Sequence, residues 1–315
     1  MAGNLVARSD EITQRQRRAG EAEASGRRLL VILNPVAGRR RRDFLTAVLG
    51  RLEGAGCRVT LHETRAPGDA RRIAAAAGLE AFDAVVAAGG DGTVNEVANG
   101  LGDGDAGLAL GLIPLGTTNV LAGELGIVLD PERIAKLLVS SDRRPIYPGR
   151  VDGHRFLMMA SVGIDARVVA GVDLGLKRWL GEGAYVMRAL RELSGTPPPP
   201  FSVRIGDRRT QAATVIAAKG KRYAGPFTVA PEADLGRPDL EICLLAGGGR
   251  ADIARQALAL ATDRFAGLPG LEIARAPALT IEAPTGAPVQ ADGDIVATLP
   301  VTIDVAPVPL SVLAP

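Results

Sequence analysis

The sequence is poor in three residue types from which common functional sites are built. Only 3% of its 315 residues are aromatic, and it has two cysteines and two histidines. A surface that binds nucleic acid by stacking on bases needs aromatic side chains, so we expect no nucleic-acid partner. Cys57 and Cys243 lie far apart and outside any Cys-x-x-Cys pair. We therefore expect neither a structural zinc site nor a disulfide framework, which fits a reducing compartment.

Long apolar runs are also missing. The chain has no run of 18 apolar residues that could cross a bilayer, and residues 1–28 lack the apolar stretch of a secretory signal. These residues predict a flexible N-terminal tail, with a surface-binding amphipathic arm as the alternative. We expect a cytoplasmic protein. The content of 47% hydrophobic and 23% charged residues is typical of a globular chain, and its length suits two domains.

The first half of the chain alternates strand and helix patterns. Residues 28–34 form a short apolar run typical of a buried parallel strand, and apolar residues at helical spacing follow in 41–54. The same alternation predicts strands at 57–62, 82–88 and 108–114 and helices at 69–78, 93–101, 119–125 and 131–140. We predict a doubly wound parallel sheet, an α/β nucleotide-binding domain over residues 29–144, with its ligand at the carboxyl ends of the strands.

The second half has strand patterns with few helices between them. Strands are predicted at 156–160, 201–205, 214–218, 240–244, 278–282, 295–297 and 301–305, with helices at 177–193 and 251–265. This pattern predicts a mainly antiparallel β-sandwich domain over residues 145–307. Residues 308–315 are a separate C-terminal segment that could return to the first domain.

The strongest functional motif runs from Gly89 to Glu96 and reads Gly-Gly-Asp-Gly-Thr-Val-Asn-Glu between a predicted strand and a predicted helix. Glycines let backbone N–H groups approach a phosphate closely, and the positive end of the following helix points to the same place. The Asp91 carboxylate can hold Mg²⁺ against the phosphates, while Thr93 and Asn95 add a hydroxyl and an amide. A packed turn with Thr93 as helix cap is the structural alternative, but the complete motif favours phosphate binding.

Two further glycine turns fall at the same predicted sheet edge. The first spans Asn34–Gly38 and is followed by four arginines, 39–42. Cations at a helix start are electrostatically unfavourable, which suggests an anion nearby and makes Arg39 or Arg40 a candidate phosphate ligand. The second runs from Ile113 to Asn119 and brings hydroxyl and amide groups to the same crevice.

In this order and with this spacing the three motifs resemble the diacylglycerol kinase catalytic-domain family, whose relatives include sphingosine and ceramide kinases. The resemblance covers about residues 28–310 and is specific to family rather than to substrate. It implies an ATP site between the two domains, Mg²⁺ as cofactor, a lipid alcohol as substrate, and transient peripheral contact with the inner membrane face. Diacylglycerol is the first candidate acceptor, with ceramide or a sphingoid base as others. A homodimer is compatible with the sequence.

The resemblance also assigns individual residues. Thr64 resembles the family's nucleotide-contacting threonine, and Gly163-Ile-Asp165 resembles its Gly-Phe-Asp stretch. The segment that ends in Asp292-Gly-Asp294 resembles its Asp-Gly-Glu, so Asp294 is the implied general base, although the same residues suit a hairpin turn. The residues expected to bind the nucleotide are Asn34, Pro35, Gly38, Arg39, Thr64, Gly89, Gly90, Asp91, Gly92, Thr93, Asn95, Glu96, Gly116, Thr117 and Asn119; Asp91 is also the expected metal ligand.

Two departures from the family pattern bear on these assignments. Asp294 replaces the usual glutamate and is one methylene shorter. The segment Pro231–Asp239, which in some members binds a structural Mg²⁺, lacks the family's paired acids, and this puts that metal in doubt. Two other functions stay open: an NAD kinase-like soluble enzyme, although the serine/alanine/glycine-rich segment of that family is absent, and a non-catalytic nucleotide- or lipid-binding regulator.

Overall fold

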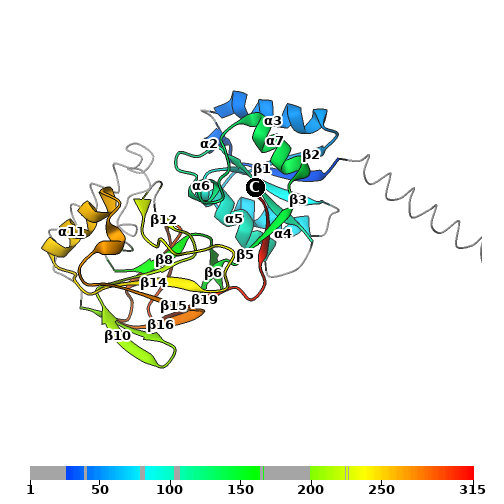
Figure 1. Ribbon diagram of the computed structural model, residues 1–315. Helices are drawn as coiled ribbons and strands as arrows, with labels where there is room; N and C mark the ends of the chain where they lie inside the picture. Colours follow the sequence, from blue (N-terminus) through cyan, green and yellow to red (C-terminus); the bar gives the residue numbers. More distant parts are fainter. Residues whose placement is uncertain are drawn as a thin grey trace, which may run out of the picture.

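The protein folds into two domains that lie side by side (Figure 1). The computed structural model describes residues 26–38, 41–78, 82–102, 107–163, 166, 199–223, 225 and 227–315. Most of the predicted N-terminal tail, Arg39 and the helix predicted at 177–193 lie outside these residues. Among the described residues, no helix has the length and apolar character needed to cross a bilayer.

The first domain is built on a six-stranded sheet in the order β2-β1-β3-β4-β20-β5. Its first four strands in sequence pair in parallel, as predicted. They can do so because the helix after each strand brings the chain back to the edge of the sheet at which the next strand begins. Strands β1, β3 and β4 are almost entirely buried and form the centre of the core. The strands are β1 (Arg28–Leu33), β2 (Arg58–Glu63), β3 (Ala84–Gly89), β4 (Ala109–Pro114), β5 (Arg143–Ile146) and β20 (Leu310–Leu313).

The helices of this domain cover both faces of the sheet (Figure 1). α3 (Arg42–Gly54) packs against α7 (Pro131–Ser140), and α4 (Asp69–Ala77) packs against α5 (Asp91–Leu101). The short helices α2 (Pro35–Gly38) and α6 (Val120–Glu124) follow β1 and β4.

The second domain is a sandwich of two six-stranded sheets, in the orders β10-β9-β16-β19-β6-β7 and β15-β14-β11-β8-β17-β18. Apolar side chains from both sheets share one core, which includes Phe156, Phe201 and Ile242. The predicted antiparallel sandwich is therefore confirmed. The elements are β6 (Gly149–Val151), β7 (His154–Phe156), β8 (Met159–Val162), β9 (Phe201–Ile205), β10 (Arg208–Ala212), β11 (Thr214–Ala218), β12 (Arg222–Tyr223), β13 (Phe227–Thr228), β14 (Leu240–Leu245), α11 (Arg250–Ala261), η2 (Phe265–Gly267), β15 (Leu271–Ala276), β16 (Ala278–Ala283), β17 (Pro288–Ala291), β18 (Asp294–Thr298) and β19 (Val301–Val305).

Two predicted elements differ from the structure in an informative way. The strand expected at 156–160 is wrong, because the chain breaks between β7 and β8, where the N–H groups of Leu157 and Met158 donate to the carboxylate of Asp292. The helix expected to start at Thr93 begins two residues earlier, with Gly90 as its N-cap residue, so Asp91 and Gly92 belong to its first turn.

The C-terminal segment belongs to the sheet of the first domain. β20 pairs in parallel with β4 and antiparallel with β5, so the chain returns from the sandwich to the sheet in which it began (Figure 1). Val312 and Leu313 are 0% and 1% exposed and contribute to the core of the first domain.

We expect Val312→Ala to lower the free energy of unfolding by roughly 1.5–3 kcal/mol, because two buried methyl groups are lost and a cavity remains. Val308→Ala is the matched control, since Val308 is 38% exposed and lies four residues earlier. Urea denaturation of the two variants measures the difference. Equal stabilities would contradict the structural role of β20.

Candidate active site at the carboxyl edge of the sheet

The first and second strand-to-helix turns are linked by a side-chain hydrogen bond. Asn34 Nδ2 donates to Thr93 Oγ1 at 3.3 Å, and Asn34 Oδ1 accepts the N–H of Val36 at 3.0 Å. The backbone N–H of Asn34 donates to the carbonyl of Ala88 at 2.9 Å. Asn34 therefore shapes the start of α2 and ties it to the first turn of α5.

The second and third turns touch each other through their glycines. A Cβ at Gly116 would lie 2.6 Å from Gly90 Cα, and a Cβ at Gly89 would collide with the side chain of Thr93. Gly89 and Gly116 are therefore required for packing within the protein, and a Cβ at Gly90 would lie within 3.3 Å of Gly116 Cα. Gly92 differs, because it is exposed and, apart from its chain neighbours and the backbone of its own helix, no heavy atom of the described residues lies within 4 Å of the position of its Cβ.

Asp91 and Asn119 order the third turn. Asp91 Oδ1 accepts the N–H of Val120 at 2.7 Å, at the start of α6. Asn119 adopts a left-handed conformation with φ of 48°, and its amide closes on Gly116, accepting from Gly116 N at 3.0 Å and donating to Gly116 O at 2.8 Å. Burial raises the pKa of Asp91, while hydrogen bonds from the α6 backbone oppose that shift.

The donor set at this edge fits Mg²⁺ only in company with a nucleotide. Among the described residues there is no group of three or more His, Cys, Asp or Glu side chains that could hold a metal ion alone. Mg²⁺ in phosphotransfer sites is commonly held by one or two carboxylates together with the substrate phosphates. One oxygen of Asp91 is engaged by α6, and metal binding by Asp91 stays a prediction.

The remaining predicted nucleotide residues have varied surroundings. Glu96 Oε1 and Oε2 accept the N–H groups of Gly68 and Ala70 at 3.0 and 3.1 Å, so its carboxylate orders the start of α4. Thr64 follows β2, and its N–H donates to Leu33 O at 2.9 Å. Pro35 and Gly38 form the two ends of α2, and Thr117 is exposed. Their contacts with a nucleotide stay predictions, as does that of Arg39, which lies outside the described residues.

We call the meeting point of the turns that contain Gly90, Gly92 and Gly116 the glycine mouth. The side chain of Asn95 contacts the boundary with the second domain instead. Its Nδ2 donates to Asp292 Oδ2 at 2.9 Å and to Arg155 O at 3.4 Å. Asn99, one turn later, donates to the same Arg155 carbonyl at 3.0 Å and accepts the N–H of Arg155 at 2.9 Å. α5 therefore forms the glycine mouth at its first turn and a domain contact further along.

Asp292 is a buried carboxylate at this site that was not predicted from the sequence as a site residue. Its carboxylate accepts the N–H groups of Leu157, Met158 and Met159 at 2.6, 3.0 and 3.0 Å, in addition to the amide of Asn95. Burial raises the pKa of Asp292, and the four N–H donors act against that shift because they favour the carboxylate. Its proximity to Asp294 in an Asp-Gly turn was the only sequence signal available.

Asp294 begins β18 immediately after this turn. Asp292 and Gly293 have φ of 48° and 89°, and Ala291 pairs with Asp294 across the hairpin. The hairpin alternative for this segment is therefore realised. Asp294 is exposed. Burial lowers the pKa of His154 and the charge of Arg71 adds to this shift, while the charge of Asp294 opposes it.

A segment of the second domain lies against the third turn. Glu124 of α6 accepts the N–H of Lys221 at 3.0 Å and forms an ion pair with Arg222 at 3.9 Å. A Cβ at Gly225 would lie 3.3 Å from Thr118 Cγ2. The glycine mouth of the first domain is thus bordered by residues of the second, which periodicity alone gave no means of predicting.

We expect Asp292→Asn to lower the free energy of unfolding by roughly 2–4 kcal/mol, because an amide NH₂ would face N–H donors and the charge-assisted hydrogen bonds would be lost. Asp294→Asn is the matched control, and its effect is expected to stay within about 0.5 kcal/mol because Asp294 is exposed. Urea unfolding monitored by circular dichroism gives both values. A stable Asp292→Asn variant would contradict the role of this carboxylate.

Comparison with known proteins finds two family models that match successive parts of the chain. Residues 28–151 match the family model described as the diacylglycerol kinase catalytic domain, and residues 158–314 match the model described as the YegS C-terminal NAD kinase beta sandwich-like domain. A crystal structure of a diacylglycerol kinase from Bacillus anthracis str. Sterne superposes with a TM-score of 0.71 at 19% identity, covering 92% of this chain and 97% of that one. This likeness supports the fold.

Curated relatives extend the likeness to sequence. Diacylglycerol kinase of Bacillus subtilis (strain 168) is 33% identical over 235 residues, covering 73% of this chain and 78% of the relative. A probable lipid kinase YegS-like protein of Pseudomonas aeruginosa (strain UCBPP-PA14) is 31% identical over 272 residues, covering 84% and 87%. With the glycine turns and both domains in place, the chain belongs to the diacylglycerol kinase-like, YegS-like family of lipid kinases.

Proposed function

We propose that this protein is an ATP-dependent kinase that transfers the γ-phosphoryl group of ATP to the hydroxyl of a lipid. The observation that carries the proposal is the exposed first turn of α5, where Gly92 leaves space free of described protein atoms beside the meeting point of the glycine turns. Diacylglycerol is the first acceptor to test, followed by ceramide and a sphingoid base.

The first turn of α5 suits the phosphates of a nucleotide. The N–H groups of a helix N-terminus have no intrahelical partners, and the helix dipole is positive there. Because Gly92 has no side chain, a phosphate can approach this backbone closely. Thr93 Oγ1 and Asn34 Nδ2, which are hydrogen-bonded to each other, lie at the same edge and add polar groups.

Mg²⁺ bound with the nucleotide would neutralise negative charge that develops on the phosphates. The residue of this chain that would contact it is Asp91, whose carboxylate is already oriented by the N–H of Val120. The protein's own contribution at this point is to hold that carboxylate beside the first turn of α5.

Asp294 is the proposed general base. As the lipid oxygen forms its bond to the γ-phosphorus, the bond from that phosphorus to the bridging oxygen of ADP breaks, and the hydroxyl proton passes to the Asp294 carboxylate. Asp292 acts through Asp294, since its hydrogen bond to Asn95 ties the hairpin that carries Asp294 to α5. The acceptor's apolar chains would lie in the second domain, during transient contact with a membrane surface.

The deciding experiment offers labelled ATP and Mg²⁺ to the protein with diacylglycerol, ceramide and sphingosine in separate mixed micelles, and with NAD in solution. Label in one lipid supports the proposal. Label in NAD alone supports an NAD kinase, and nucleotide binding without label in any acceptor supports a regulator.

In this assay we expect Asp294→Asn to lower kcat by about 10²–10⁴-fold, the range for loss of a general base, with little change in the KM for ATP. Its folded state is checked by thermal unfolding. A variant with wild-type kcat would remove Asp294 from the mechanism while leaving the kinase activity itself established.

Gly92→Ala separates nucleotide binding from packing. The added methyl meets no described protein atom within 4 Å, and alanine favours the helix by roughly 0.5–1 kcal/mol over glycine, so the fold is not weakened. We expect the KM for ATP to rise at least about 10-fold, equivalent to about 1.4 kcal/mol of lost binding. Gly50→Ala is the control, since Gly50 is also an exposed helix glycine with no described atom near its Cβ position. Equal KM values for the two variants would argue against phosphate binding at α5.

A further inference from the structure

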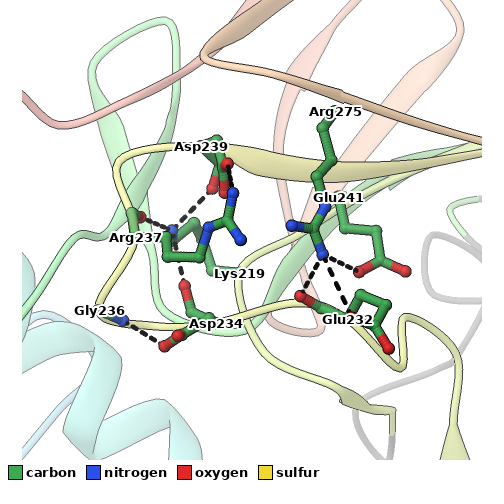
Figure 2. A network of polar contacts seen from close by, with 8 residues as sticks. All are labelled: Lys219, Glu232, Asp234, Gly236, Arg237, Asp239, Glu241 and Arg275. Atoms are coloured by element: carbon green, nitrogen blue, oxygen red, sulfur yellow. Dashed lines mark hydrogen bonds and ion pairs between the residues drawn. The ribbon is translucent and has the colours of Figure 1, made fainter.

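A buried lysine holds the segment that precedes β14. Lys219 is 0% exposed, and its Nζ donates to the backbone carbonyls of Asp234 at 3.2 Å and Asp239 at 2.8 Å. It also donates to the carbonyl of Arg237. Figure 2 shows the three carbonyls converging on this one nitrogen from different sides. An ammonium group has three N–H donors, so all three are used.

The choice of lysine at this position is unusual for this chain. Among its 37 basic residues only Lys136, Lys177, Lys219 and Lys221 are lysines, and the remainder are arginines. A guanidinium group is planar and suits carboxylates, whereas an ammonium is a compact point charge. Three carbonyls that surround one point match the ammonium. They are also the kind of oxygen set that binds a hard metal cation.

The carboxylates in the segment are engaged elsewhere. Asp234 Oδ1 accepts the N–H of Gly236 at 2.8 Å, and Asp239 Oδ2 pairs with Arg237 Nη2 at 2.7 Å (Figure 2). Neither contact involves Lys219 Nζ. The carbonyl oxygens therefore provide the cation site, and the nearby acids stabilise the loop and its positive charge from outside.

The loop that Lys219 holds joins the two domains. Leu235 is 4% exposed and packs into the core of the first domain, and its carbonyl accepts the N–H of Tyr147 at 2.7 Å, between β5 and β6. On the other side, the N–H groups of Lys219 and Gly220 donate to Met158 O at 2.8 and 3.0 Å. Lys219 thus connects two segments. Its side chain binds the loop of residues 234–239, and its backbone binds Met158, whose N–H donates to Asp292.

We propose that the Lys219 ammonium is a built-in cation that occupies the carbonyl site of residues 234–239 and replaces a bound metal ion there. This is the segment in which the family resemblance implied a structural Mg²⁺ and in which the paired acids are missing. The proposal is independent of the kinase reaction, because it concerns how the loop between the domains is held.

The charge state agrees with this assignment. Burial lowers the pKa of Lys219 to about 8, with Asp239 and Asp234 acting against the shift and Arg237 adding to it. The amine is therefore mainly protonated at pH 7 and carries the charge that a cation site requires.

The first test compares Lys219→Ala with wild type and with Lys136→Ala, an exposed lysine on α7, in nucleotide-free buffer with and without CaCl₂. Three carbonyls lose their donor in Lys219→Ala, so we expect its Tm to fall by roughly 4–12 °C. Ca²⁺, which accepts irregular oxygen sets, should restore part of that loss in a saturable manner and leave wild type and Lys136→Ala unchanged. A normal Tm for Lys219→Ala, no gain from Ca²⁺, or an equal gain in wild type would overturn the proposal.

The second test needs no variant at position 219 and holds if Lys219→Ala does not fold. In the Lys136→Arg/Lys177→Arg/Lys221→Arg protein, Lys219 is the only lysine. With ¹⁵N-labelled lysine, a protected ammonium signal at pH 7 is expected, because three hydrogen bonds and burial slow proton exchange with water. Absence of this signal from the folded triple variant would show that Lys219 is not held as a cation.

Discussion

The hydrogen bonds that the Asp292 carboxylate accepts join the two domains at a single point. Three come from consecutive backbone N–H groups between β7 and β8, and the fourth comes from Asn95 on α5. A carboxylate enclosed in this way is stabilised only while all its donors stay in place. Because α5 carries the glycine mouth and Asp292 lies in the hairpin of Asp294, this carboxylate helps to set the distance between the two, together with the hydrogen bonds between Asn99 and Arg155.

The glycines at the carboxyl edge of the first domain's sheet have two distinct physical roles. Gly116 allows the turn after β4 to pack against Gly90 in the turn after β3, and Gly89 leaves room for the side chain of Thr93, since a Cβ at either position would collide with protein atoms. Gly92 has open space instead, which leaves room for the phosphate of the proposed function to approach the backbone. This open position lies in the first turn of α5, and the N-terminal end of a helix favours an anion.

Sequence periodicity was sufficient to predict the sheets of both domains but not the contacts between the domains. The alternation of strands and helices predicted the parallel sheet, and β9, β11 and β19 match the predicted ranges. The break at Leu157 was not predictable, because it depends on Asp292, 135 residues further along the chain. Likewise the hydrogen bonds of Asn95 to Asp292 and of Glu96 to the start of α4 could not be predicted from the place of these residues in the glycine motif, and their contacts with a nucleotide stay predictions.

The buried ammonium group of Lys219 can also be explained by what the surrounding backbone requires. The loop before β14 presents three carbonyls to one point, and such a loop is unstable unless a cation or donors satisfy them. A free ion binds reversibly and loses its affinity as its concentration falls, whereas a tethered ammonium is always present. Since Leu235 extends from this loop into the core of the first domain, a permanent cation makes the interdomain geometry independent of the metal supply. Under the proposed function, Mg²⁺ would then be required only together with the nucleotide.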